Sequence, residues 1–296
     1  MARKPGWSYS ARKTFEECKR AFYYDKYPYM CPDKSRVYMF KKMSAIPLLA
    51  GSAVHSAISR AAEDVRSFGR APSAEKITER YLDLFDRGAR LSREAADSLK
   101  YGETAESLLM EHYYGDPEAE DKLAASRQSR LEGLQAFLES ELWQKITETG
   151  RDGFVEVDRD DLFPSFDLDG ITVYAKIDLA LGGKNWLRIF DWKTGKADRA
   201  DLTQLAVYVL YAKYALRRDP ARTAVEFVYL DGSTSRDKHN SVDPALLEET
   251  EGLIRKSYGE MLRLYNGGNP RLEEHPMNTG AGCSRCRFKE LCGMQG

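Results

Sequence analysis

Apolar residues recur every three or four positions in much of the chain, which is the spacing of helices with one buried face. In residues 8–27 this spacing joins Phe15, Cys18 and Phe22, and it predicts a short amphipathic helix. A second helix is predicted over 47–69, because a proline opens this stretch and a glycine closes it. The first part of the chain is therefore expected to be helical.

The helical period continues through residues 70–150, which hold no cluster of His, Cys or paired carboxylates with a recognisable spacing. This block is expected to be a helical insertion. The period changes to two over 154–192, which predicts three or four strands with hairpins at the Leu-Asp-Gly and Gly-Gly-Lys-Asn turns. A helix near 201–216, a strand over 224–232 and a helix near 243–266 follow. The pattern predicts an α/β fold with a central mixed β-sheet flanked by helices.

Composition places the chain among ordinary globular proteins. It has 296 residues, of which 42% are hydrophobic and 31% charged, and this size lies near the upper limit of one domain. We therefore expect a single domain over 1–296. No run approaches the roughly 18 to 20 apolar residues of a membrane span, and the first residues lack the apolar stretch of a signal peptide. The cytoplasm is the expected location.

The net charge of −1 hides an uneven distribution. Residues 1–42 carry eleven Lys or Arg against four Asp or Glu, and residues 283–296 carry three against one. Basic ends around an acidic middle suit a polyanion that is held by a local patch. A solvated basic start with no partner is an equally common explanation of the same pattern.

Two carboxylates and a lysine stand at the ends of predicted strands. Asp178 ends one apolar stretch and Asp191 the next, and Lys193 shares a face with Asp191 because side chains alternate along a strand. A hairpin joins the two strands, so the acids can converge and offer the oxygen ligands that Mg²⁺ prefers. Lys193 could then orient or deprotonate a water molecule at the metal and offset charge on a phosphate. The alternative is a strand-end salt bridge between Asp191 and Lys193.

Two pairs of helical residues extend this set. Gly51 and His55 in "GSAVH" lie one turn apart, so the glycine would let another backbone approach where the imidazole points. Gln204 and Tyr208 in "QLAVY" share one face of the helix that follows, and they can reach back toward the strand ends. Packing against the sheet would explain the tyrosine, but not a glutamine one turn earlier.

The stretches "GSAVH", "KIDLAL", "DWKTGK" and "QLAVY", in this order, resemble the four motifs of the RecB and AddB type nuclease domain of the PD-(D/E)XK superfamily. The resemblance implies a restriction-endonuclease-like fold. It implies these ligands for Mg²⁺ or Mn²⁺: His55, Asp178, Asp191 and the backbone carbonyl of Trp192. It also implies that Lys193 is the catalytic lysine and that Gln204 and Tyr208 position Lys193 or the substrate backbone.

The chain has five cysteines: Cys18, Cys31, Cys283, Cys286 and Cys292. The last three are spaced C-x2-C-x5-C, so their thiolates can converge within one short loop. An odd count and a cytoplasmic location argue against a disulfide framework. Thiolate ligation of zinc or of an iron–sulfur cluster explains the spacing better, and four cysteines are the usual complement of a [4Fe–4S] cluster.

Cys18 is the expected fourth ligand. The segment "CKRAFYYDKY" resembles iron–sulfur members of the nuclease family, among them AddB and the CRISPR-associated spacer-acquisition nucleases. In those proteins one N-terminal cysteine and a C-terminal C-x2-C-x5-C share a [4Fe–4S] cluster. Cys31, which precedes a proline, is the competing choice. A cluster held by Cys18 and the cysteine-rich tail at 283–296 would staple the two ends of the chain and gather their basic residues.

These features predict a metal-dependent DNA nuclease, an exonuclease that acts on single-stranded or unwound ends. The alternative is a DNA-end-binding or scaffolding module of a helicase, repair or spacer-acquisition complex with little activity of its own. The intact set of Asp178, Asp191 and Lys193 favours the enzyme, because a scaffold has no need to keep like charges close together.

Overall fold

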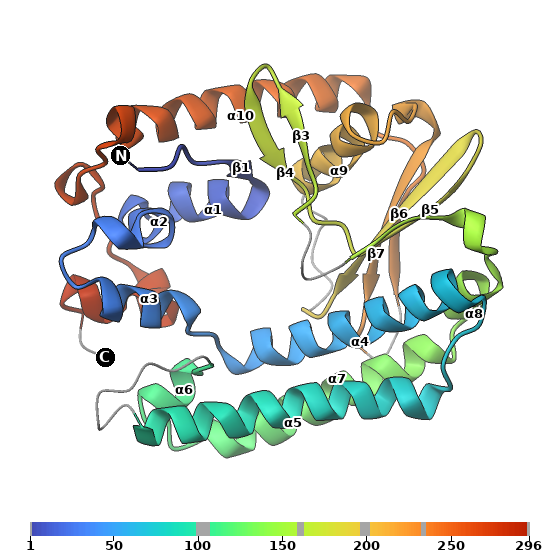
Figure 1. Ribbon diagram of the computed structural model, residues 1–296, viewed down its shortest axis with the longest axis horizontal. Coiled ribbons are helices and arrows are strands. Elements are labelled where there is room, and N and C mark those ends of the chain that lie inside the picture. Colours follow the sequence, from blue (N-terminus) through green and yellow to red (C-terminus); the bar gives the residue numbers. More distant parts are fainter. Residues whose placement is uncertain (1, 99–106, 159–162, 196–201, 232–234, 295–296) are drawn as a thin grey trace.

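The computed structural model describes residues 2–98, 107–158, 163–195, 202–231 and 235–294 (Figure 1). Two β-sheets, each with parallel and antiparallel strand pairs, are flanked by helices. This confirms the mixed α/β class that the change of hydrophobic period predicts.

The larger sheet carries the strands that the sequence pattern marks most clearly. It has the order β2-β5-β6-β7-β8, with these bounds: β2 Phe154–Val157, β5 Leu179–Gly183, β6 Trp186–Lys193, β7 Thr223–Tyr229 and β8 Arg236–His239. Neighbouring strands are antiparallel except β6 and β7, which are parallel. Leu179 faces Phe190 across the β5–β6 hairpin, which turns at the predicted Gly-Gly-Lys-Asn sequence. Strand β8 was not predicted.

The smaller sheet consists of β1 Trp7–Ser8, β4 Ile171–Tyr174 and β3 Ser165–Leu168, in this order. Strands β3 and β4 form the hairpin predicted at Leu-Asp-Gly, where Asp169 and Gly170 have φ of 53° and 82°. The expectation of three or four strands in one sheet was wrong, because this stretch holds β2 to β6 and divides them between two sheets. Periodicity marks which residues form strands, whereas pairing depends on hydrogen bonds between distant segments.

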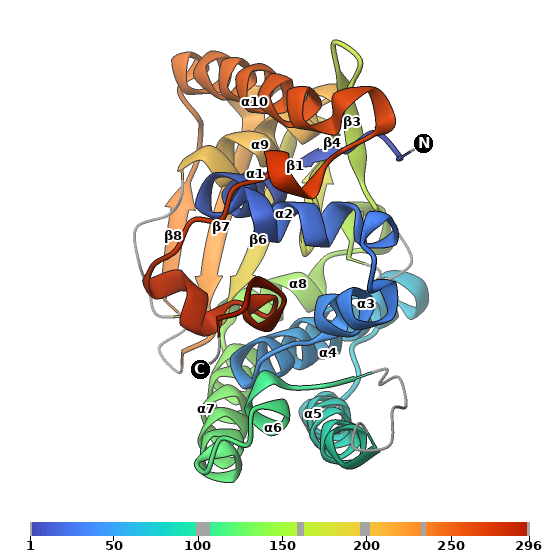
Figure 2. The same ribbon diagram turned by 90° about the vertical axis from the view of Figure 1, so that its left-hand side faces the viewer.

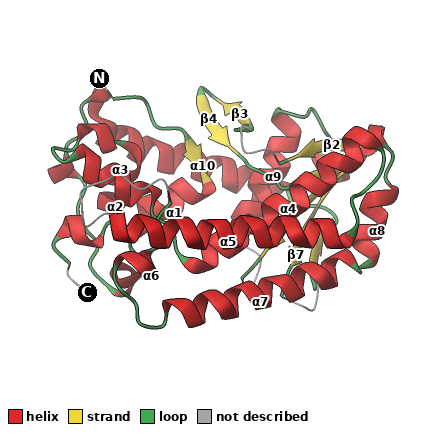
Figure 3. Cartoon of the chain, turned by 60° about the horizontal axis from the view of Figure 1, so that its bottom comes forward, coloured by secondary structure: helices red, strands yellow, loops and turns green. Residues whose placement is uncertain are grey.

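The helices have these bounds: α1 Tyr9–Glu17, α2 Lys19–Lys26, α3 Lys34–Lys42, α4 Ile46–Phe68, α5 Ala74–Ser98, α6 Met110–Tyr113, α7 Ala119–Leu138, α8 Glu141–Glu148, α9 Leu202–Tyr214 and α10 Pro244–Tyr265. Pro47 lies in the first turn of α4, and Gly69, with φ of 72°, follows its last residue, as the sequence predicts. Helices α4, α5 and α7 contact one another (Figure 3). The described part of 70–150 is thus mainly helical, while its status as an insertion in one domain stays a prediction. No described helix is both long and apolar enough to cross a membrane.

Each face of the larger sheet has its own core. On β7, Val225, Phe227 and Tyr229 belong to the core shared with α9, α10 and the N-terminal helices. Val228 belongs to the core shared with α4, α5 and α7. The alternation follows from the two-residue period of a strand, so helices pack against both faces of the sheet.

The helix predicted over 8–27 is two helices in the structure. Helix α1 ends and α2 begins at Cys18, whose backbone is extended, with φ of −158° and ψ of 109°. Phe15 and Phe22 still pack together, with ring centroids 5.0 Å apart. The shared apolar face was therefore predicted correctly and the continuity of the helix was not, because one extended residue leaves the spacing on either side unchanged.

The C-terminal tail lies against the helices near the start of the chain (Figure 2). The ring of Tyr24 in α2 packs 5.5 Å from that of Phe288 in the tail, and Arg287 forms a 3.1 Å ion pair with Asp25. At the other end, the N–H of Ala2 donates to the carbonyl of Gly268 at 2.7 Å. These contacts bring the two basic segments of the sequence into one region.

Candidate active site

A cleft of about 1190 Å³ opens between α4, the start of α1 and the strand ends. It is lined by five of the predicted site residues: His55, Asp178, Asp191, Gln204 and Tyr208. They come from α4, β6, α9 and the residue before β5, so four separate parts of the chain must fold before the group exists. Buried charged groups on the wall of a large cleft are typical of binding and catalytic sites.

Asp178 immediately precedes β5 and is only 7% exposed. Its Oδ2 accepts a hydrogen bond of 2.7 Å from the backbone N–H of Trp192, and its Oδ1 lies 2.9 Å from Nδ1 of His55. Because Leu179 pairs with Phe190 in the adjacent strand, the same register carries Asp178 alongside Asp191. The hairpin and α4 together therefore fix this carboxylate between an imidazole and a second acid.

Asp191 belongs to a closed ring of four side chains. Nζ of Lys193 lies 2.5 Å from Oδ2 of Asp191 and donates to Oε1 of Gln204 at 2.9 Å. Nε2 of Gln204 donates to the hydroxyl of Tyr208 at 2.8 Å, and that hydroxyl donates to Oδ1 of Asp191 at 2.5 Å. Strand β6 supplies two of these side chains and α9 the other two, so the ring couples a strand end to a helix face.

Burial and nearby charge shift the pKa values of the site. Burial, and then the carboxylate of Asp178, raise the pKa of Asp191, although Lys193 and Tyr208 oppose the rise. Burial next to Asp191 holds the pKa of Tyr208 well above its ordinary value, which keeps its hydroxyl a donor. Burial lowers the pKa of His55, but Asp178 and Asp191 outweigh that effect, so this pKa is raised. The site concentrates negative charge and favours cations.

The ion pair that the alternative interpretation requires is present between Asp191 and Lys193. Asp191 lies just past the last pair of the β5–β6 hairpin, Leu179 with Phe190, and β6 continues to Lys193 in its parallel ladder with β7. Both charged groups also bond to α9. Asp191 of this pair lines the cleft and Lys193 does not, so the ion pair adjoins the cleft wall, and its presence is compatible with a functional site.

Helix α4 comes close to the residue after β6 at Gly51. A Cβ at this position would lie 2.8 Å from Oγ1 of Thr194. The neighbour is thus a side chain, not the backbone that the sequence analysis expected. Since His55 is one turn further along α4 and Thr194 follows Lys193, this contact sets the spacing between the imidazole and the lysine.

The structure places further residues in the cleft that the sequence analysis did not single out: Ser59, Arg60, Asp158, Phe163 and Lys176. Nζ of Lys176 lies 3.1 Å from Oδ2 of Asp158. Ser59 follows His55 by one helical turn, so the helical period offered a signal for it. No comparable signal exists for Phe163, which lies outside the helices and strands.

The donor atoms of the cleft are those that a hard divalent cation binds, namely carboxylate oxygens, with an imidazole nitrogen that favours Mn²⁺ over an all-oxygen set. Across the described residues, however, no group of three or more His, Cys, Asp or Glu side chains is arranged to hold a metal ion. The N–H of Trp192 is bonded to Asp178. Metal ligation by the backbone carbonyl of Trp192 stays a prediction, and so do the ligand roles of His55, Asp178 and Asp191.

A second, small cavity lies between the chain ends and is lined by four thiols: Cys18, Cys283, Cys286 and Cys292. Burial, and then the neighbouring Cys286, raise the pKa of Cys292 to about 11. Cys31 is buried elsewhere, where its Sγ lies 3.8 Å from the carbonyl of Tyr27. The structure thus brings together the four predicted cluster ligands and leaves out the competing cysteine, although their thiols, too, lack the arrangement of a metal site.

The chain belongs to the PD-(D/E)XK nuclease superfamily, whose family model matches residues 6–293. Members of this superfamily are typically nucleases that use Mg²⁺ or Mn²⁺. The match confirms the predicted superfamily, while the RecB and AddB subtype and the iron–sulfur cluster stay predictions. The comparison with curated proteins gives no match.

Among solved structures, one described as "Crystal structure of SSO0001" is 14% identical to this chain. The likeness covers 69% of this chain and 84% of that one, with a TM-score of 0.31. At this level it adds nothing to the family assignment.

Proposed function

We propose that this protein is a metal-dependent DNA nuclease that hydrolyses phosphodiester bonds as an exonuclease at single-stranded or unwound ends. The observation that carries the proposal is the ring of Asp191, Lys193, Gln204 and Tyr208, joined by three hydrogen bonds and one ion pair, beside Asp178 and a large cleft. The ring holds an ammonium group against a carboxylate that faces a second carboxylate, an arrangement suited to a phosphoryl substrate and a cation together.

The cation would be Mg²⁺ or Mn²⁺, held by His55, Asp178, Asp191 and the carbonyl of Trp192. When bound, it would polarise the scissile phosphate and offset its negative charge. The donor chemistry fits this role, since the raised pKa of Asp191 reflects a burial and a repulsion that a cation relieves. The bond from the Trp192 N–H keeps Asp178 oriented toward the cleft.

Lys193 is the proposed catalytic lysine. An ammonium group has three N–H donors, and contacts with Asp191 and Gln204 engage two of them. The third remains for the attacking water or a phosphate oxygen. Hydrolysis adds the hydroxyl of water to phosphorus and a proton to the leaving sugar oxygen, so a group that orients water and supports developing negative charge accelerates it. Gln204 and Tyr208 act on Lys193 and Asp191, and are positioning residues.

The experiment that tests this function uses purified protein, Mn²⁺ and end-labelled single-stranded DNA. We expect progressive shortening from one end, abolished by a chelator. DNA that is bound but stays at full length in Mn²⁺ would favour the other candidate, a DNA-end-binding or scaffolding module of a helicase, repair or spacer-acquisition complex.

We further propose that Cys18, Cys283, Cys286 and Cys292 hold a [4Fe–4S] cluster with a structural role. The shared cavity of these four cysteines and the separate burial of Cys31 support this ligand set. The cluster would supply four iron–thiolate bonds that join the chain ends. Iron and sulfide analysis of protein purified without oxygen tests it, and one tightly bound zinc per chain would replace the cluster with a zinc staple.

A further inference from the structure

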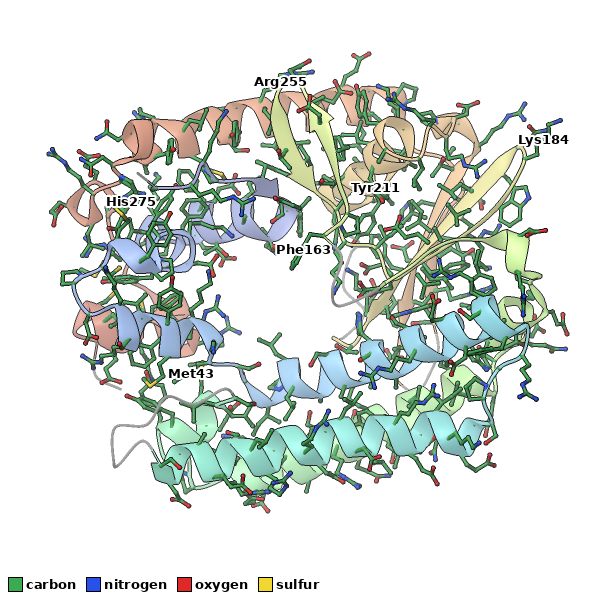
Figure 4. The ribbon with its side chains drawn as sticks, viewed as in Figure 1. Met43, Phe163, Lys184, Tyr211, Arg255 and His275 are labelled. Carbon is green, nitrogen blue, oxygen red and sulfur yellow. The ribbon has the colours of Figure 1, made fainter. Side chains whose placement is uncertain are left out.

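Phe163 is an aromatic side chain in an unusual setting. It is 77% exposed, yet it lines the same cleft as Asp178 and Asp191. Figure 4 shows it beside the opening that separates α1 from α4. A large apolar side chain left in water loses the stabilisation that burial would give it, and its place on the wall of a cleft points to a ligand that covers it.

Helix α4 presents a different chemistry to the same cleft, with the hydroxyls of Ser52, Ser56 and Ser59 and the side chain of Arg60. Ser59 is only 7% exposed, and its Oγ has no hydrogen-bond partner among the described residues. A buried hydroxyl without a partner, on a residue that lines a cleft, is suited to an acceptor that a ligand brings to it. Arg60 is exposed, and none of the ion pairs found in the described residues includes it.

One wall thus offers an aromatic face and the other offers hydroxyl donors and a guanidinium group. A single nucleic-acid strand has the matching pair of surfaces, since its unpaired bases stack on aromatic rings and its phosphates accept hydrogen bonds from hydroxyl and cationic groups. In a duplex the base faces are covered by their neighbours. The cleft therefore fits an unpaired nucleotide next to the phosphate at the carboxylate site.

We propose that Phe163 is the base-stacking residue of this cleft and that Ser59 and Arg60 bind the phosphate backbone of the same strand. The proposal rests on the proposed nuclease function and deepens it, because it assigns to one residue the preference for unpaired bases. It also places the strand, with its bases toward Phe163 and its phosphates toward α4.

The test measures binding without cleavage. Single-stranded DNA that carries one 2-aminopurine base is titrated with the protein in the presence of a chelator. The titration is then repeated with a series of oligonucleotides in which an abasic site occupies each position in turn. Stacking on an aromatic ring is worth about 1–3 kcal/mol per base, so Phe163→Ala should weaken binding by roughly fivefold or more. An abasic site at one position should weaken wild-type binding by the same factor and leave the variant unaffected. Phe163→Trp should restore both effects.

The chain offers a matched control in Phe68, which is 67% exposed, ends α4 and does not line the cleft. Phe68→Ala should bind as the wild type does. Ser59→Ala should weaken binding of intact and abasic strands equally, because it acts on the phosphate. Equal effects of Phe163→Ala and Phe68→Ala, or no position-dependent effect of the abasic site in the wild type, would overturn the proposal.

Cleavage assays on the same proteins separate this inference from the proposed function. If the wild type cleaves in Mn²⁺ and Phe163→Ala binds and cleaves single strands as the wild type does, the stacking role alone is wrong. If Phe163→Ala and the abasic site weaken binding as described but the wild type does not cleave, the nuclease function is wrong and the stacking role of Phe163 stands. A wild-type protein that neither binds nor cleaves single strands would overturn both.

Discussion

The cleft and the thiol-lined cavity both gather chemically reactive side chains from distant parts of the chain, but they are held in different ways. In the cleft, Asp191, Lys193, Gln204 and Tyr208 bond to one another, and they stand on a strand and a helix. In the cavity, Cys283 and Cys292 lie on short 3₁₀ turns at 281–285 and 289–292, and Cys286 directly follows the first turn. The cysteines of the chain are free thiols.

The two sites therefore differ in how far their geometry depends on a bound metal ion or cluster. Charged groups that satisfy one another on regular elements keep their geometry from the protein alone. Thiols on short turns make few strong hydrogen bonds, so the cavity itself would gain most from a cross-link, although packing and an ion pair also join the tail to α2. We therefore expect the cleft to lose function without losing structure when altered, and the cavity to lose structure first.

Lys193→Ala tests the cleft and has the largest expected effect. It should lower cleavage by at least about 100-fold, a typical effect for a group that assists proton transfer, with little change in melting temperature because the lysine is partly exposed. Lys184→Ala at the β5–β6 turn is the matched control and should cleave normally. Near-normal turnover in Lys193→Ala would favour the alternative, in which Asp191 and Lys193 form only a strand-end salt bridge.

Cys18→Ser tests the cavity. It should bleach protein purified without oxygen and reduce the free energy of unfolding by about 2–4 kcal/mol, the usual scale for a cross-link that closes a long loop. Absorbance and thermal melting provide the measurements. Cys31→Ser is the control and should keep its colour. Bleaching in Cys31→Ser alone would mean that the fourth ligand is wrongly assigned.

His55→Ala tests whether His55 binds the metal ion or only packs in the cleft. It should weaken Mn²⁺ binding by roughly tenfold or more, without the loss of several kcal/mol that truncation of a fully buried side chain causes. Mn²⁺ titration and thermal melting measure the two effects. His239→Ala on β8, whose imidazole pairs with Asp237 on the surface, should change neither. A variant that unfolds but binds Mn²⁺ normally per folded molecule would indicate a packing role.

The smallest expected effect is that of Gly51→Ala. The new methyl group would meet Thr194 and shift α4 against β6, so turnover should fall by about threefold to tenfold through a small misplacement of His55 and Lys193. Combining it with Thr194→Ala removes the obstructing oxygen and should restore turnover. Gly252→Ala, at a helical position with open space around it, should be neutral or slightly stabilising. Failure of the double variant to recover would exclude the steric cause.

Much of the local structure could be predicted from the sequence, because helix and strand periods are set by neighbouring residues. The limits of α4 follow from Pro47 and Gly69, and two hairpins follow from their turn residues. The order and spacing of four short motifs also indicated the superfamily that the family match confirms. Each of these signals lies within a short stretch of chain, where chemistry and conformation are directly linked.

The contacts between distant segments depend on the tertiary structure. The division of the strands into two sheets, the break at Cys18, the contact of Gly51 with Thr194, and the exposure of Phe163 in the cleft leave no mark in any local pattern. The physical reason is that these features depend on hydrogen bonds and packing between segments far apart in sequence, whose free energy is set by the whole arrangement and not by the residues on either side.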